Sequence, residues 1–387
     1  MLTVQSLVTM ALFSVPVFAV VAAIDLGVPA RWIGGYISLV YITAMASSGM
    51  GGLFALRFGA IRMCQACLAI AAISLCLTAT GWLPLFMLGA LVMGIAYGPP
   101  TPASSHILSR YTPPRLMPVV FSVKQTGVPL GGALAGAIIP VLVLAQGWRA
   151  ASLYIAAACL VAMVALQPLR ARFDADRDPG QRLRGNLLTP FRQVMADAVL
   201  RRFAFMSFLY SSVQMSLVTY FVTYLVEDVT LDLVTAGMVL AAAQTAGIFG
   251  RILWGSLSGL VLTARRILAL LGLSMAAAAV VTALFEPGWP LAALIAVSVL
   301  FGATAIGWNG VFLAEFARLA PPGQAGLVTG GSMVVTFAGV VVAPPVFGVL
   351  VMATGGYGAS FILLAVLGVA GMVLLAGIPE RPGGTGG

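Results

Sequence analysis

Charged residues are scarce in this sequence: Asp, Glu, Lys and Arg together make up 8% of its 387 residues, whereas hydrophobic residues make up 61%. Soluble domains carry roughly 25% charged residues. A surface with so few charges is unsuited to water but suited to lipid, and the mean hydropathy of +1.07 agrees. The composition therefore excludes a soluble globular protein and predicts a membrane protein.

Lysine and histidine are almost missing, since Lys124 and His106 are the only examples of each. A P-loop needs Gly-Lys-Ser/Thr to hold phosphates, and Val123 precedes the one lysine, so we expect no ATP site. GxSxG and HExxH motifs are also missing, which argues against a hydrolase. We therefore expect neither an enzyme nor a bound cofactor.

Cysteine is rare as well, and its pattern indicates no metal site. Cys64 and Cys67 form a CxxC inside an apolar run, but a structural zinc site requires two further ligands. We interpret these two, with Cys76 and Cys159, as free thiols in helices and expect neither a disulfide framework nor a metal.

Twelve apolar stretches are each long enough to cross about 30 Å of hydrocarbon as a helix. The first has no basic residue before Arg31, so we expect a retained helix and not a signal peptide. The helices are predicted at residues 4–25, 34–55, 62–81, 83–107, 117–144, 148–168, 202–226, 234–258, 265–285, 290–315, 325–352 and 357–378.

A charged segment at 169–201 separates the twelve stretches into two sets of six. We therefore predict an N-terminal bundle at 1–168, a cytoplasmic linker at 169–201, and a C-terminal bundle with a short tail at 202–387. The net charge of +9 would suggest nucleic acid in a soluble protein, but here the basic residues lie between apolar stretches. We expect no nucleic-acid partner.

The arginines are distributed unevenly between the two sets of loops. With the linker in the cytoplasm, sixteen arginines fall on that side, and only Arg31 and Arg149 fall on the other. The positive-inside rule then places both termini in the cytoplasm, in a membrane of the bacterial inner (plasma) type. The halves also resemble each other, because HILSRYTPP at 106–114 corresponds to EFARLAPP at 315–322. Internal repeats of this kind are typical of secondary transporters.

The segment GLFALRFGAIR, at 52–62, resembles the loop between helices two and three of the major facilitator superfamily, Gly-x-Leu-Ala-Asp-Arg-x-Gly-Arg-Arg. Leu56 replaces the aspartate that helps to latch the cytoplasmic gate in that family. The resemblance implies an all-α fold of twelve helices in two bundles related by pseudo-two-fold symmetry. It also implies gating roles, which we assign to Gly52, Arg57, Gly59, Arg62 and, in the second copy, Gly255.

Helix five contains KQTGVPLGGALAG, at 124–136, which resembles the glycine- and proline-rich motif of helix five in the same family. Small residues let helices approach closely and rock against each other. We expect this packing role for Gly127, Pro129, Gly131 and Gly132.

Two cations lie within predicted spans, each about 10 Å from the cytoplasmic end. A charge inside the membrane costs several kcal/mol and usually has a function. Lys124 in helix five is interpreted as an anion-binding group; the alternatives are a structural hydrogen bond and snorkelling. Arg251 in helix eight resembles the arginine that binds the substrate carboxylate in monocarboxylate and oxalate carriers, and the chain also has some likeness to cyanate-permease-like carriers. Monocarboxylate carriers have an Asp at the position of Gly247, and the alternative role for Arg251 is in the gate.

Further polar and aromatic side chains are candidates for lining a substrate cavity. Glu315 and Arg318 are spaced as an i,i+3 pair at the cytoplasmic edge, which suggests gating. Proton coupling through Glu315 or His106 is left open, and Asp25 is interpreted as a solvated or capping residue. The cavity candidates are Tyr97, Gln125, Tyr210, Gln214, Gln244, Trp308 and Asn309.

These features predict a secondary active transporter, a symporter or antiporter, for a small organic anion such as a mono- or dicarboxylate. We expect it to act as a monomer in the bilayer. The first alternative is efflux of drugs or hydrophobic metabolites, although helix four lacks the Leu-x-x-x-Arg pattern of proton-coupled drug exporters. The second alternative is a membrane sensor or scaffold without transport activity.

Overall fold

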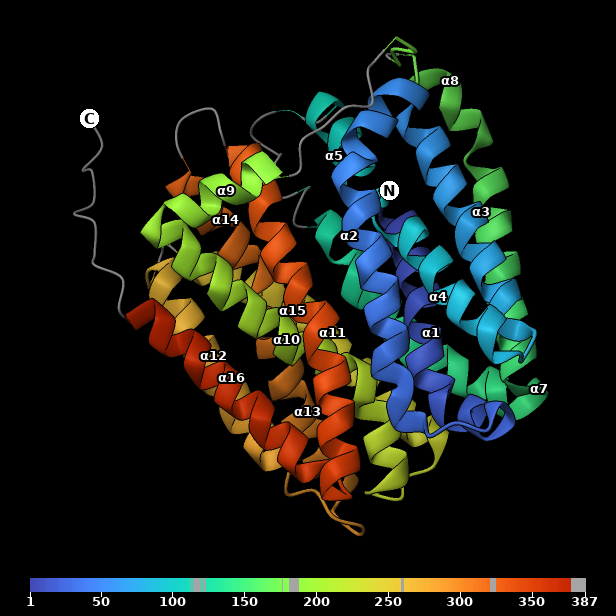
Figure 1. Ribbon diagram of the computed structural model, residues 1–387, viewed down its shortest axis with the longest axis vertical. Coiled ribbons are helices and arrows are strands. Elements are labelled where there is room, and N and C mark those ends of the chain that lie inside the picture. Colours follow the sequence, from blue (N-terminus) through green and yellow to red (C-terminus); the bar gives the residue numbers. More distant parts are fainter. Residues whose placement is uncertain are drawn as a thin grey trace.

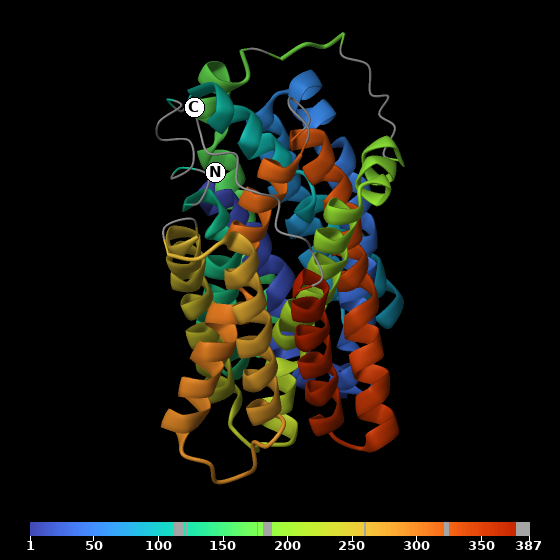
Figure 2. The same cartoon turned by 90° about the vertical axis from the view of Figure 1, so that its left-hand side faces the viewer.

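The structure is a computed structural model of the 387-residue chain. It describes all residues except 112, 114–119, 121–122, 176, 181–187, 259–260, 321–324 and 377–387. Within this described part the chain is helical and contains no β-strand. Most helices run along one long axis, and the N-terminus lies toward the end that carries α8 and α9, which we call the linker end (Figures 1 and 2).

The helices follow the predicted order. The first half contains α1 (Leu2–Leu26), the 3₁₀ turn η1 (Ala30–Trp32), α2 (Ile33–Phe58), α3 (Ala60–Ala79), α4 (Leu83–Tyr97), α5 (Pro100–Tyr111) and α7 (Gly127–Ala165). Next come η3 (Gln167–Leu169), α8 (Arg170–Phe173) and α9 (Leu188–Ala196). The second half contains α10 (Ala198–Glu227), α11 (Leu233–Leu257), α12 (Ala264–Thr282), α13 (Leu291–Ala305), α14 (Asn309–Leu319), α15 (Ala325–Thr354) and α16 (Gly358–Ala376).

Nine helices in the described residues meet the length and apolarity needed to cross a membrane. One of these spans contains α7, which is broken at Gly147, where φ is +82°, so that it supplies two crossings. With helix α2 and the α4–α5 pair, the total reaches the twelve that the sequence predicts. Residues 114–119 and 121–122, in and just before the predicted helix 117–144, lie outside the described residues.

The two halves pack against each other mainly through α2 with α15 and α7 with α11, and α1 also contacts α10. Glycines allow the α7–α11 crossing to be tight. A Cβ added to Gly136 would lie 2.6 Å from the carbonyl oxygen of Gly237, and one added to Gly237 would lie 2.3 Å from that of Gly136. Because neither glycine leaves room for a side chain, the two backbones meet directly.

The halves are also joined by hydrogen bonds at the far end, which is opposite to the linker end. The Tyr220 hydroxyl on α10 lies 2.9 Å from the carbonyl oxygens of both Arg31 and Pro344 and accepts a hydrogen bond from the Gly34 amide at 3.2 Å. The Ser38 hydroxyl donates to the Val341 carbonyl. These bonds tie η1 and α2 to α10 and α15, so the two halves are held together at the far end.

A carboxylate from the linker region supports the turn between α2 and α3. Asp174 is 6% exposed, and its side chain accepts hydrogen bonds from the backbone amides of Ile61 at 2.7 Å and Arg62 at 3.1 Å. It thereby satisfies amides at the start of α3 that have no partner within the helix. Gly59, with φ of +100°, leaves room for it, because a Cβ there would lie 2.4 Å from Asp174 Cγ.

Replacing Asp174 by Ala should lower the midpoint of thermal unfolding in detergent, because losing a helix-capping acceptor costs roughly 0.5–2 kcal/mol. Asp174→Asn keeps one oxygen acceptor and should give a smaller shift. Asp178→Ala is the matched control, because the Asp178 side chain accepts only a local, exposed bond from the Gly180 amide. Equal shifts for Asp174→Ala and Asp178→Ala would show that Asp174 does not anchor this turn.

Candidate functional site

Two transmembrane crossings are interrupted at corresponding places in the two halves. Crossing four stops at Tyr97 and resumes as α5 at Pro100, and crossing ten stops at Ala305 and resumes as α14 at Asn309. Prolines explain the first break, since Pro99 and Pro100 have no backbone N–H to continue the helix. Interrupted helices at matching positions indicate a binding site in transporters with internal repeats.

Side chains from α11 stabilise the second break, which contains no proline. Arg251 Nε donates to the Ile306 carbonyl at 3.1 Å, and Trp254 Nε1 donates to the Ala303 carbonyl at 2.9 Å. Gly247 lets α11 come this close, since a Cβ there would lie 2.7 Å from Ile306 Cβ. The position where monocarboxylate carriers have an Asp is therefore filled here by the Ile306 side chain.

Arg251 also reaches across to the other half of the protein. Its Nη1 donates to the main-chain carbonyl of Gln125 at 2.7 Å. Both of these acceptors are neutral carbonyl oxygens. Among the residues that the structure describes, Arg251 has no carboxylate within salt-bridge distance.

Lys124 is buried beside the same residue. Its side chain is 4% exposed, and Nζ donates to the side-chain oxygen of Gln125 at 3.1 Å. Like Arg251, it has no acidic partner in the described part of the chain. The structure therefore brings together Lys124, Gln125 and Arg251, which the sequence had placed only by their depth in two separate helices.

A second polar cluster lies at the α13–α14 break. The Gln214 side-chain oxygen, on α10, accepts hydrogen bonds from Trp308 Nε1 at 3.1 Å and Asn309 Nδ2 at 2.9 Å. Trp308 is fully buried, whereas Gln214 and Asn309 are partly exposed. Three further predicted cavity residues are thus in mutual contact, next to the segment whose carbonyl binds Arg251.

Tyr97 ends α4 immediately before the first break. Its ring packs edge-on against Tyr41, with centroids 5.5 Å apart, and Tyr41 packs against Phe337 of α15 at 5.8 Å. These rings connect the first break to α15 in the second half.

The other two predicted cavity residues pack within helix contacts. The Tyr210 hydroxyl donates to the Leu268 carbonyl at 2.8 Å, and its ring lies against Gly272 and Gly371 inside the second half. Gln244 lies in the α7–α11 contact, where a Cβ on Gly132 would be 2.3 Å from its Nε2. This Nε2 is buried and has no hydrogen-bond partner among the described residues.

The glycine-rich start of α7 brings this helix close to α1 and α11. A Cβ on Gly131 would lie 2.4 Å from the Ser6 carbonyl oxygen, and one on Gly127 would lie 3.0 Å from Gln5 Cβ. Pro129 is buried in the same contact region.

Gln5 is a polar residue that the sequence analysis missed; its side-chain oxygen accepts a hydrogen bond from Thr101 at 3.2 Å. Its polar side chain within the first apolar span could have identified it from the sequence.

The predicted gating residues lie at the linker end of their helices. Arg318 binds Glu315 through two hydrogen bonds, Nη2 at 2.6 Å and Nε at 2.8 Å. The hydrogen bonds and charge of Glu315 raise the pKa of Arg318. Gly52 lies in α2 and Gly255 in α11. Arg57 lies in the last turn of α2, Gly59 joins α2 to α3, and Arg62 lies in the first turn of α3.

Of the proton-coupling candidates, His106 has a side chain outside the described residues, while Glu315 is paired with Arg318. Asp25 lies at the far end, where it accepts a hydrogen bond from Trp148 Nε1 at 3.0 Å and lies 3.3 Å from Arg149 Nη1. These contacts are those of a surface pair that fixes a helix end.

The chain is similar to known membrane transporters in sequence. It is 25% identical over 303 residues to the uncharacterized MFS-type transporters MT3072 and Rv2994 of two Mycobacterium tuberculosis strains. The match covers 76% of this chain and 64% of each relative, so the chain matches less than two thirds of the relatives' length.

Solved structures share the fold at low sequence identity. A bacterial homologue of the human lysosomal transporter Spinster, in an inward-facing and occupied conformation, superposes with a TM-score of 0.74 at 16% identity, covering 97% of this chain and 93% of that one. The E. coli fucose:proton symporter FucP gives a TM-score of 0.61 at 14% identity, covering 95% and 97%. These likenesses confirm the predicted all-α fold.

The family itself is established by a direct sequence match. The profile of the Major Facilitator Superfamily matches residues 1–338, which is most of the chain. The match includes the α2–α3 turn, the glycine-rich start of α7 and both interrupted crossings described above. The family predicted from the loop at 52–62 and the motif at 124–136 is thus confirmed, and this multi-pass membrane protein belongs to the Major Facilitator Superfamily.

Proposed function

We propose that the protein is a secondary active transporter that moves a small organic anion, a mono- or dicarboxylate, by alternating access. One observation carries this proposal: Lys124 and Arg251 come from different halves, converge on Gln125, and have only neutral oxygen partners among the described residues. Buried charges are usually paired, because an unpaired one is expensive to keep away from water. An anionic substrate would supply the missing charge.

The partners of both cations resemble the oxygens of a carboxylate. Arg251 Nη1 is held by the main-chain oxygen of Gln125, and Lys124 Nζ is held by the side-chain oxygen of the same residue. A carboxylate replacing these neutral acceptors would form charge-assisted hydrogen bonds, which are roughly twice as strong as neutral ones. The planar guanidinium of Arg251 also suits bidentate binding. Gln214 and Asn309 supply polar groups at the α13–α14 break, and Tyr97 supplies one at the α4–α5 break.

Binding at this place would act on the contact between the two halves. The bond from Arg251 to Gln125 joins α11 to the residues that precede α7, so an anion that takes Arg251 competes with it. The far end is closed by Tyr220 and Ser38. We place the linker end in the cytoplasm from the arginine distribution, so the closed far end faces the opposite side of the membrane. Alternating access would then rock residues 1–168 against residues 202–387.

We assign gating to the contacts at the linker end. The Arg318–Glu315 pair and the α2–α3 turn held by Asp174 are two polar contacts there. Closing this end would bring the two halves together around Gly52, Arg57, Gly59, Arg62 and Gly255. The direction of transport and the coupling ion are not part of the proposal.

Removing either cation should weaken binding and uptake of the anion. Arg251→Gln and Lys124→Gln should each weaken binding by roughly 10–100-fold, since a hydrogen bond to a charged group contributes about 1.5–3 kcal/mol. Arg251→Lys should retain part of the affinity, because it keeps the charge without the bidentate geometry. The measurement is uptake into proteoliposomes, after a thermal-shift screen of lactate, oxalate, malonate and succinate against their neutral amides.

The matched control is Arg149→Gln, which removes a surface-paired arginine at the far end. It should leave uptake unchanged. If both Lys124→Gln and Arg251→Gln still bind the carboxylates as tightly as the wild type, the anion site is refuted. Binding without flux in the wild type would favour a sensor over a transporter.

Gln125→Leu should have a different effect, because it removes the oxygen that binds Lys124 but keeps the main-chain carbonyl that binds Arg251. The variant should be less stable without a ligand, since Lys124 loses its acceptor, and a carboxylate should raise its unfolding temperature more than that of the wild type. Gln65→Leu is the control: its side chain bonds to Met163 and Gln167 away from the site, so its ligand-induced shift should match the wild type. If a carboxylate raises the unfolding temperature of Gln125→Leu less than that of the wild type, the carboxylate does not compete with the Gln125 side chain for Lys124.

A further inference from the structure

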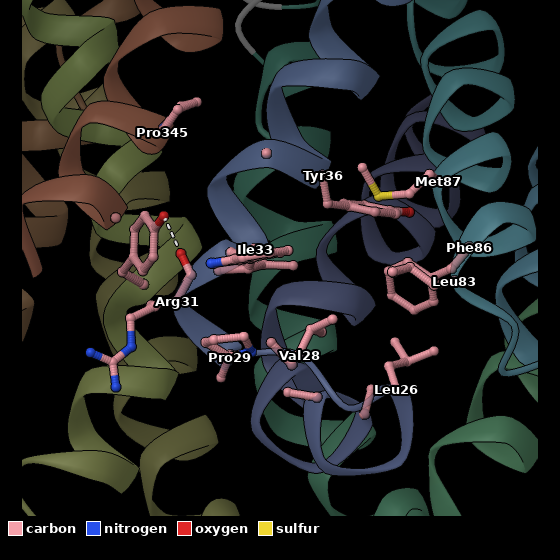
Figure 3. A pocket seen from close by; sticks show the side chains of 18 of the residues that line it. Leu26, Val28, Pro29, Arg31, Ile33, Tyr36, Leu83, Phe86, Met87 and Pro345 are labelled. Carbon is pink, nitrogen blue, oxygen red and sulfur yellow. Dashed lines mark hydrogen bonds between the residues drawn. The ribbon is translucent and has the colours of Figure 1, made fainter. Parts of the chain in front are cut away.

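A cavity of about 300 Å³ lies at the far end, away from Lys124 and Arg251. It is lined by α1, η1, α2 and α4 of the first half and by α10 and α15 of the second (Figure 3). Its walls are almost entirely apolar, with Leu83, Phe86 and Met87 on one side and Val349 and Met352 on the other. This volume is at the lower end of the range of cavities that bind small molecules.

Exposed aromatic residues indicate the depth of this cavity in the membrane. Trp32, which lines it, is 55% exposed, and Trp82, immediately before α4, is 61% exposed. Tryptophans collect at the boundary between hydrocarbon and lipid headgroups. The cavity therefore lies where the acyl chains of the bilayer begin.

A cation without a carboxylate partner lies at the edge of the cavity. Arg31 is one of the lining residues, and its main-chain oxygen is 2.9 Å from the Tyr220 hydroxyl. Figure 3 shows its guanidinium turned away from the apolar side chains. In the described part of the chain no acidic group lies within salt-bridge distance of it, whereas the other far-end arginine, Arg149, lies 3.3 Å from Asp25.

We propose that this cavity is a lipid site, in which one acyl chain of a bilayer phospholipid fills the apolar space and its anionic headgroup pairs with Arg31. An apolar wall with a single cation at its edge is complementary to a long apolar chain joined to a negative group. The small carboxylates of the transport site have no such chain. The position at headgroup level, marked by Trp32 and Trp82, favours a bilayer lipid over an anion dissolved in water.

The structure offers a substitution that fills the cavity without a clash. Gly35 lines it, and a Cβ added there would meet no atom within 4 Å. Gly35→Leu should therefore occupy the space of the acyl chain while the helix keeps its position. Gly330→Leu is the matched control, because Gly330 is an exposed glycine on α15 that also has no atom within 4 Å of an added Cβ.

The test uses the full chain in phosphatidylcholine nanodiscs that contain a fixed fraction of either brominated phosphatidylglycerol or brominated phosphatidylcholine. Bromine quenches nearby tryptophan fluorescence, and subtracting the signal of Trp32→Phe isolates Trp32 from the other five tryptophans. We expect the phosphatidylglycerol to associate at Trp32 about fivefold more than the phosphatidylcholine, the size expected for one basic residue beside an anionic headgroup.

Arg31→Gln should reduce this preference to nearly one, and Arg31→Glu should invert it. Gly35→Leu should lower quenching by the anionic lipid. Arg149→Gln and Gly330→Leu should behave like the wild type, and the anion-induced thermal shift of the transport site confirms that each variant is folded. Equal quenching by both lipids in the wild type, or an unchanged preference in Arg31→Glu, would overturn the proposal. Displacement of the lipid by an equal fraction of free oleate would assign the site to a fatty acid instead.

Discussion

Two positive charges that lack a negative partner among the described residues constrain the centre of this protein, where Lys124 is buried and Arg251 is partly buried. An isolated ion in the low-dielectric interior loses several kcal/mol of hydration, and neutral dipoles restore only part of it. Lys124 and Arg251 receive such dipoles from Gln125, and Arg251 also from Ile306. Because Gln125 and Ile306 belong to different halves, Arg251 is best satisfied while the halves remain together at this depth. The two cations therefore lack a compensating negative charge, and separating the halves at this depth would break the bond between Arg251 and Gln125.

The interruption of crossing ten follows from the same contacts. A helix that stops at Ala305 leaves carbonyl oxygens without their usual amide partners, and donors on α11 take their place. The resumed helix α14 directs its N-terminal amides toward the break, which adds a partial positive charge of about half a unit. Crossing four is interrupted in the same place by prolines. Both halves therefore present positive potential toward the middle of the membrane, although they use different residues to do so.

Much of this arrangement could be predicted from the sequence, but its contacts could not. Apolar run lengths give the twelve crossings, and Pro99 with Pro100 gives the first break. The second break contains no proline, and the hydrogen bonds that stabilise it come from side chains about fifty residues away on α11. Likewise, Leu56 shows that an aspartate is missing from the α2–α3 turn, but only the fold shows that Asp174, more than a hundred residues later, places a carboxylate on that turn. Tyr210 and Gln244 are polar residues in apolar spans, as are Gln214 and Asn309, and only packing reveals which of them face a partner helix.

Tyr220 takes part both in the contact that closes the far end and in the wall of the cavity. Its hydroxyl lies between the carbonyl oxygens of Arg31 and Pro344, so the bond that closes the halves also positions the backbone of the arginine beside the cavity. The cavity itself is lined by both halves, and its shape exists only while they are closed at this end. A ligand that binds one conformation and not the other stabilises that conformation in proportion to its affinity. A lipid bound beside Arg31 would therefore favour the state closed at the far end, whereas an anion at Gln125 would weaken a bond that holds the halves together near the middle. The two ligands would act on the same rocking motion in opposite senses, and lipid composition would set how much of the anion's binding energy is needed to drive it.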